Sequence, residues 1–295
     1  MSWIYLALFA QFINAAVFLL DKFLLTSKSI ARPLAYVFYV SMLSGVAVLI
    51  LPFGAVSWPT VQVIWLSLAT GGAFTVSLYF LYSALFSADA SDVAPAVGAV
   101  SALASLFFSF WFLGNILTGS FLLGFVLLVA GTALMSYFRF NRRTTGHVLL
   151  AGVFFALSVV TVKMLFDVTS FWNGFFWSRL GNLVVALSLL FWPANRRIFL
   201  HNVLASSHKT KFLVLASKFL AGIAFLLILI SIKLGNVALV NAIAGAQFVF
   251  LLLFALIFTK KFPKYFYETV HHHVAIIQKV AATFLIVAGY FLLFI

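Results

Sequence analysis

Uninterrupted apolar runs of about twenty residues recur along the whole chain and constrain its fold more than any other feature. A helix of about that length crosses a hydrocarbon core of about 30 Å, whereas a membrane-spanning strand needs about ten residues that alternate in polarity. Of the 295 residues, 65% are hydrophobic and 8% are charged, which leaves too few polar residues to cover the surface of a soluble domain. The sequence therefore predicts an all-α integral membrane protein.

Charges, prolines and glycines divide the chain into ten predicted transmembrane helices joined by short connections. The helices are expected near residues 3–25, 34–51, 61–85, 93–112, 119–138, 147–167, 172–192, 212–232, 236–258 and 274–295. The first run exceeds twenty residues and has no Lys or Arg ahead of it, so we interpret it as a helix of the mature protein and not as a signal peptide.

The two halves of the chain resemble one another, and residues 1–140 and 141–295 are predicted to be two five-helix repeats. The matching positions, which lie 141, 144 and 158 residues apart, are Lys22 with Lys163, Asp92-Val93-Ala94 with Asn236-Val237-Ala238, and Val129-Ala130-Gly131 with Val287-Ala288-Gly289. Because five is odd, the second copy would enter the membrane from the opposite side, which predicts inverted repeats with a pathway between them. The alternative is chance similarity among apolar helices.

Short motifs accompany this pattern: Asp21-Lys22 at the end of the first predicted helix, the Ala-Leu-x-x-x-x-Ala-Ser-x-Val-x-Pro run from Ala84 to Pro95, and the Leu-Gly-x-x-Leu-Thr turn from Leu113 to Thr118. With the glycines of the fifth and tenth helices, these features resemble the drug/metabolite transporter superfamily, EamA-domain type. The resemblance covers essentially the whole chain. It implies a ten-helix fold and the transport of a small solute.

Basic residues are concentrated in alternate connections, which bears on orientation. Thirteen Lys and Arg lie in or beside the first, fifth, seventh and ninth connections, and two, Lys163 and Lys233, lie beside the others. The positive-inside rule then places both termini outside the cytoplasm, whereas the family resemblance implies that both lie inside. The orientation is left open.

Two cations fall within predicted helices, Arg179 in the seventh and Lys218 in the eighth, and neither helix contains an acid. Ionisable residues inside a membrane are costly and are functional candidates by default. An uncompensated positive interior attracts carboxylates or phosphates and repels cations, which favours an anionic or zwitterionic substrate. The alternative is that both side chains snorkel to the interfaces or bind backbone carbonyls.

Further candidate substrate-binding residues are the amides Asn14, Asn182 and Gln247, the helix-end cations Lys22 and Lys163, and the aromatic residues Tyr79, Tyr82 and Trp177. Asn182 follows Arg179 by three residues and would share its face of the helix. Each amide is alternatively an interhelical hydrogen-bonding group, and each aromatic ring an interfacial residue.

Catalytic and cofactor motifs are not found in the sequence, so neither an enzyme nor a cofactor is expected. The chain has no cysteine. The three consecutive histidines 271–273 cannot all face one ion from a helix, because neighbouring side chains point about 100° apart. We therefore expect no metal site.

The sequence favours a secondary transporter of a small organic metabolite that works by alternating access. Two alternatives stay open: a lipid-linked phosphate flippase or lipid exporter, and a membrane assembly protein that transports nothing. The expected location is the plasma membrane, the cell's inner membrane, as a multi-pass protein. Its expected partners are membrane lipid and a small-molecule substrate, without nucleic acid, and a homodimer is left open.

Overall fold

The chain is an α-helical bundle in a computed structural model that describes residues 2–26, 33–88, 90–117, 119–136, 140–193, 195–196, 208–258 and 273–294. These residues form helices and connecting turns, without a strand among them. The helices are α1 Ser2–Thr26, α2 Pro33–Met42, η1 Leu43–Phe53, α3 Val61–Ser87, α4 Ala90–Leu113, α5 Gly119–Leu134, α6 Arg142–Val168, α7 Phe171–Ser188, η2 Leu189–Phe191, α9 His208–Leu234, α10 Val237–Ile243, α11 Ala246–Phe258 and α13 His273–Phe294.

Among the described residues, six helical segments are long and apolar enough to cross a membrane, which is consistent with a multi-pass membrane protein. They are Pro33–Phe53, Val61–Ser87, Asp92–Leu113, Arg142–Val168, Phe171–Phe191 and Leu215–Leu234. Four shorter apolar helices, Ser2–Phe18, Gly119–Leu134, Val237–Leu251 and Ile277–Leu293, lie at the other predicted positions. Large apolar side chains such as Phe191, Phe219 and Phe284 cover the outer surface, as lipid requires.

Two predicted helices are irregular. The second changes from α-helix to 3₁₀-helix at Leu43. The ninth, predicted near 236–258, is present as α10 and α11, with a break after Ile243 that the sequence pattern did not indicate. At the break, the N–H groups of Ala244 and Gly245 donate to the carbonyls three residues earlier instead of four. The Tyr290 hydroxyl donates to the Ile243 carbonyl at 2.6 Å. Tyr290 thus replaces a bond that the interrupted helix lacks.

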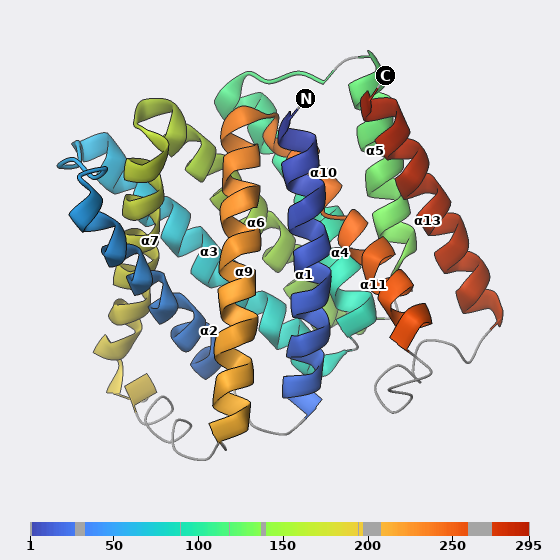
Figure 1. The fold of residues 1–295 in the computed structure, drawn as a ribbon, viewed down its shortest axis with the longest axis horizontal. Helices are drawn as coiled ribbons and strands as arrows, with labels where there is room; N and C mark the ends of the chain where they lie inside the picture. Colours follow the sequence, from blue (N-terminus) through green and yellow to red (C-terminus); the bar gives the residue numbers. More distant parts are fainter. Residues whose placement is uncertain are drawn as a thin grey trace.

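The most extensive helix pairings join one half of the chain to the other. They are α3 with α6, α5 with α13, α1 with α9, α3 with α7, and α4 with α6. Figure 1 shows α1 alongside α9 near the middle of the bundle and α5 alongside α13 at one edge. A cavity between the halves is therefore enclosed by helices that are far apart in sequence.

Glycine permits two of these pairs to approach closely. A Cβ on Gly71 of α3 would collide with the backbone of Gly181 and Asn182 in α7, and one on Gly181 would collide with the Ser67 carbonyl. At the other crossing, the carbonyls of Gly124 in α5 and Gly289 in α13 each lie 3.0 Å from the position of a Cβ on the opposing glycine. Such close backbone contact stabilises helix pairs in lipid, where apolar burial between helices contributes little.

Both chain termini lie at the same end of the bundle (Figure 1). The C-terminal ends of α1 and α11 and the N-terminal end of α9 lie at the opposite end. The end that holds the termini also holds the C-terminal end of α9.

Candidate functional site

A cavity of about 140 Å³ lies between helices of the two halves. Its wall is formed by α1, α3, α6, α7, α9, α10, the break after α10 and the start of α11, and it is largely aromatic and aliphatic. The polar side chains that line it are Gln11, Asn14, Thr70, Ser158, Arg179, Asn241 and Gln247. Of the described residues in this wall, Arg179 alone carries a charge.

The guanidinium of Arg179 is buried at this wall without an ionic partner among the described residues. Its residue is 9% exposed, and its Nε atom has no hydrogen-bond partner there. Its Cζ atom lies 4.5 Å from the ring centroid of Phe225, 5.6 Å from that of Phe74 and 6.0 Å from that of Phe175. These cation–π contacts offset part of the cost of burying the charge and leave it un-neutralised.

The start of α7 is fixed to the loop that precedes α3. Asn173 is the key residue: its amide oxygen accepts from the Ser57 N–H at 2.9 Å and from the Trp177 indole N–H at 3.1 Å. The same indole also donates to the Ser57 carbonyl at 3.1 Å. Trp177, a predicted substrate-binding residue, thus anchors α7 and is not part of the cavity wall.

Asn182 lies at the contact of α7 with α3 and η1, fully buried and outside the cavity wall. Its amide oxygen accepts from the Thr75 hydroxyl at 2.8 Å, and its amide nitrogen donates to the Ser44 hydroxyl at 2.7 Å. Both ends of the side chain are therefore engaged within the protein. The structure does not bring Asn182 together with Arg179 as a shared binding surface.

Amides from α1, α10 and α11 line another part of the cavity. On α1, the Asn14 amide donates to the Gln11 oxygen at 3.3 Å. On α10, the Asn241 amide donates to the Ser101 hydroxyl of α4 at 3.3 Å. Gln247 follows the α10–α11 break, and a broken helix at a cavity is a common way to present polar groups to a solute in transporters.

Hydroxyl groups join α3 to α6 beside the cavity. The Ser158 hydroxyl donates to the Thr70 carbonyl at 3.2 Å, and the Thr70 hydroxyl donates to that of Thr161 at 3.0 Å. Thr70 and Ser158 also line the cavity. This part of the wall is rigidly held and offers hydroxyl oxygens to a bound molecule.

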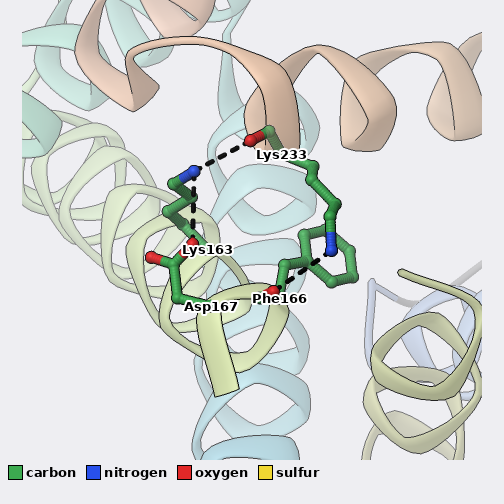
Figure 2. A network of polar contacts seen from close by, with 4 residues as sticks. All are labelled: Lys163, Phe166, Asp167 and Lys233. Atoms are coloured by element: carbon green, nitrogen blue, oxygen red, sulfur yellow. Dashed lines mark hydrogen bonds and ion pairs between the residues drawn. The ribbon is translucent and has the colours of Figure 1, made fainter. Parts of the chain in front are cut away.

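Lys163 lies at the end of α6 in a network that links α6 to α9 (Figure 2). Its ammonium group donates to the Lys233 carbonyl at 2.9 Å and pairs with Asp167 at 3.3 Å. In return, the Lys233 ammonium donates to the Phe166 carbonyl at 3.2 Å. Figure 2 shows the two lysine side chains reaching across between the helices in opposite directions.

A second, more polar pocket of about 390 Å³ adjoins this network. Lys163 and Asp167 line it together with the ends of α4 and α9. Val162 and Ile232, which precede Lys163 and Lys233 directly, line the central cavity instead. The lysine network thus lies between the central cavity and the end of the bundle that holds the termini.

The remaining predicted residues lie elsewhere. Lys218 is partly buried on α9 and does not line the cavity. Tyr79, which is 42% exposed, and Tyr82 are on α3 beyond the cavity wall. The side chain of Lys22 lies outside the described residues, as do residues 271 and 272 of the histidine run.

Phe74 and Phe225 form the aromatic contacts of Arg179 and were not singled out by sequence analysis. A signal for them exists: Gly71-x-Ala-Phe74 in α3 recurs as Gly222-x-Ala-Phe225 in α9, 151 residues later. Both phenylalanines occupy the same place in their predicted repeats. With 37 phenylalanines in the chain, composition alone does not identify this pair.

Comparison with known proteins bears on the fold alone. No family model matches the sequence, and no curated protein matches it. One solved structure, described as "Crystal structure of protein", is similar with a TM-score of 0.64 over 97% of this chain and 95% of the other, at 20% sequence identity. The helical arrangement described above therefore occurs in an experimentally determined structure over almost the full length of both chains.

Proposed function

We propose that this chain is a secondary transporter that carries a small organic anion or zwitterion across the membrane by alternating access between its two halves. The observation that carries the proposal is Arg179: a buried guanidinium without a counter-ion among the described residues, at the wall of a cavity between the halves. A fixed positive charge in a low-dielectric site favours an anionic group that enters it.

The proposed architecture is ten crossings in two inverted five-helix repeats, and the pattern of helix contacts supports it. In such repeats, predicted helix n of the first half corresponds to predicted helix n + 5 of the second. The third and sixth predicted helices, α3 and α6, then correspond to the eighth and first, α9 and α1, and both pairings are extensive. The α4–α6 pairing likewise corresponds to the packing of α1 on α10 and α11, and α5–α13 corresponds to itself. Termini at the same end of the bundle are consistent with an even number of crossings.

One pairing lacks its counterpart, which is the asymmetry expected of a transporter in one of two access states. α3 packs closely on α7 through Gly71 and Gly181. The corresponding partner of α9 would be α2 with η1, yet among the described residues these pack on α3 and α7 and make no comparable contact with α9. Exchange of the two pairings would open one side of the cavity and close the other.

The proposed transporter moves its solute without changing it chemically, and it lies in the lipid of the plasma membrane. A lipid-linked phosphate flippase would use the same guanidinium, and a non-transporting assembly protein would need no cavity. Neither alternative is favoured by a separate observation, so both serve as outcomes of the experiment.

Uptake by liposomes that contain only the purified full-length protein tests the proposal. The panel contains labelled organic anions, zwitterions and cations. We expect uptake of at least one anion or zwitterion, lost in Arg179→Gln and retained in Arg143→Gln, a matched change at an exposed arginine at the start of α6. Uptake of cations that Arg179→Gln leaves unchanged would overturn the proposal. Movement of a lipid-linked phosphate alone would support the flippase alternative.

A further inference from the structure

We infer that the cavity selects a monoanionic carboxylate with an apolar body no larger than one ring, and that it disfavours zwitterions. This inference rests on the proposed function and narrows its substrate class. Three properties of the cavity carry it: its charge, the nature of its wall and its size.

The Arg179 guanidinium is the single charged group among the described residues of the wall. It can pair with one negative group of a bound molecule, and a second negative group would have no cation to pair with. Three aromatic rings lie within 6.0 Å of the Arg179 Cζ atom, with Phe225 nearest at 4.5 Å. The groups left for hydrogen bonding are the N–H donors at the edge of the guanidinium, and these suit a planar carboxylate, which accepts two parallel bonds. A dianion would bring a second charge into a site with one cation.

An ammonium group finds no carboxylate in the described wall. The acids whose side chains the structure describes are Asp92, at the start of α4, and Asp167, which is half exposed and paired with Lys163, and neither lines the cavity. The cavity amides are partly committed to Gln11–Asn14 and Asn241–Ser101 hydrogen bonds. A zwitterion would therefore place its positive end in a positive site with incomplete compensation.

The rest of the wall is apolar. Phe74, Phe155 and Phe225 supply ring surfaces, and aliphatic side chains such as Val159 and Ile228 supply the remainder. A sugar or another polyhydroxylated body would leave hydroxyl groups without partners against these side chains. A flat ring or a short branched chain would not.

The volume of about 140 Å³ sets the size of the body. An apolar cavity of about 150 Å³ in another protein holds one benzene molecule. The site is therefore matched to benzoate-sized carboxylates, and an acyl chain or a nucleotide exceeds it.

A shape-matched charge series tests this inference: benzoate, benzamide and benzamidinium, measured by calorimetry on the purified full-length protein. We expect benzoate to bind at least roughly tenfold tighter than benzamide, because a hydrogen bond to a charged group contributes more than one between neutral groups. Benzamidinium should not bind. Equal binding of all three, or binding by none to the folded protein, would overturn the inference.

Two further comparisons separate body from charge. 3-Methylbutanoate should bind tighter than valine, which differs from it by an α-ammonium group, and benzoate should bind tighter than succinate. The reverse order in either pair would overturn the inference. In Arg179→Gln the preference for benzoate over benzamide should disappear; if that variant does not fold, Phe225→Leu keeps the charge and should weaken benzoate while leaving the charge preference intact.

These binding results are independent of transport. Selective benzoate binding by a protein that moves no solute would leave the inference standing and remove the proposed function. Transport of a hydrophilic anion by a protein that does not bind benzoate would do the reverse.

Discussion

The Thr75 hydroxyl donates a hydrogen bond of 2.8 Å to the Asn182 amide oxygen and so joins α3 to α7, one helical turn from the crossing at Gly71 and Gly181. The Asn182 amide nitrogen donates to the Ser44 hydroxyl of η1 at the same time. One buried amide thus connects three helical segments. Its position explains why α7 is fixed while Arg179, almost one turn earlier, lines the cavity.

Asn182→Ala is expected to destabilise the fold without weakening solute binding. It leaves the buried Thr75 hydroxyl without its acceptor, at a cost of about 1–3 kcal/mol. Chemical denaturation in detergent measures the free energy of unfolding, and benzoate calorimetry measures the site. A variant of unchanged stability that has lost binding would instead make Asn182 a ligand-contacting residue.

Neighbouring glycines of α3 should respond with opposite signs to the same substitution. Gly71→Ala places a Cβ against the α7 backbone and should cost about 1–3 kcal/mol through forced separation of the helices. A Cβ on Gly72 meets nothing within 4 Å, so Gly72→Ala should stabilise the helix by about 0.5–1 kcal/mol. Unfolding free energies of the two variants check this, and equal effects would contradict the close crossing.

The two lysines at the ends of α6 and α9 are expected to contribute additively to stability. Each ammonium donates to a main-chain carbonyl, so the acceptor survives replacement of the other lysine. Lys163→Met and Lys233→Met should each cost about 1 kcal/mol. A double-mutant cycle on unfolding free energies measures their coupling. A large coupling energy would show that the two bonds form only together.

The proposed exchange of helix pairings predicts a contact that this structure lacks. In the repeat alignment Gly222 corresponds to Gly71, and Ser44 corresponds to Gly181 through the shared Ser41-x-Leu43 and Ser178-x-Leu180 triplets. In the second state Ser44 should therefore approach Gly222. Because the natural chain has no cysteine, the Ser44→Cys, Gly222→Cys double variant should form a disulfide on mild oxidation.

The matched control for that cross-link replaces Ser44→Cys by Gly54→Cys, which lies beyond the end of η1. Cross-linking in the test pair and not in the control is expected, together with loss of transport that a reductant restores. Equal yields in both pairs would point to non-specific collision. No disulfide in the test pair would contradict the exchange of pairings.

The sequence predicts the helices better than their irregularities. Long apolar runs indicate helices because lipid leaves the backbone no other partner, and a helix lies at each predicted position. The break after Ile243 depends on Tyr290, which is distant in sequence and supplies a hydroxyl to the freed carbonyl. Local patterns do not contain that information.

The candidate site was predictable in part. Arg179 stands out because an intramembrane cation without a nearby acid is rare, and it does line the cavity. The three-residue spacing of Asn182 from Arg179 predicted that both would share one face of the helix, but Arg179 alone of the two lines the cavity. Residues three apart differ by about 60° around a helix, which is enough for one to face a cavity and the other a neighbouring helix. Phe74 and Phe225 could be identified as the aromatic neighbours of Arg179 only once the fold was known.

Two-sided access to the cavity is the most direct measure of alternating access. Ser158→Cys puts a thiol in the cavity wall with little change in volume, and Ser105→Cys puts one at a fully buried position outside it. A small, anionic, membrane-impermeant thiol reagent is applied to either face of oriented vesicles. The proposed function predicts that the thiol at 158 is labelled from both faces, more slowly with benzoate present, and that the thiol at 105 is labelled from neither. Labelling at 158 from one face alone, or from neither, would contradict it.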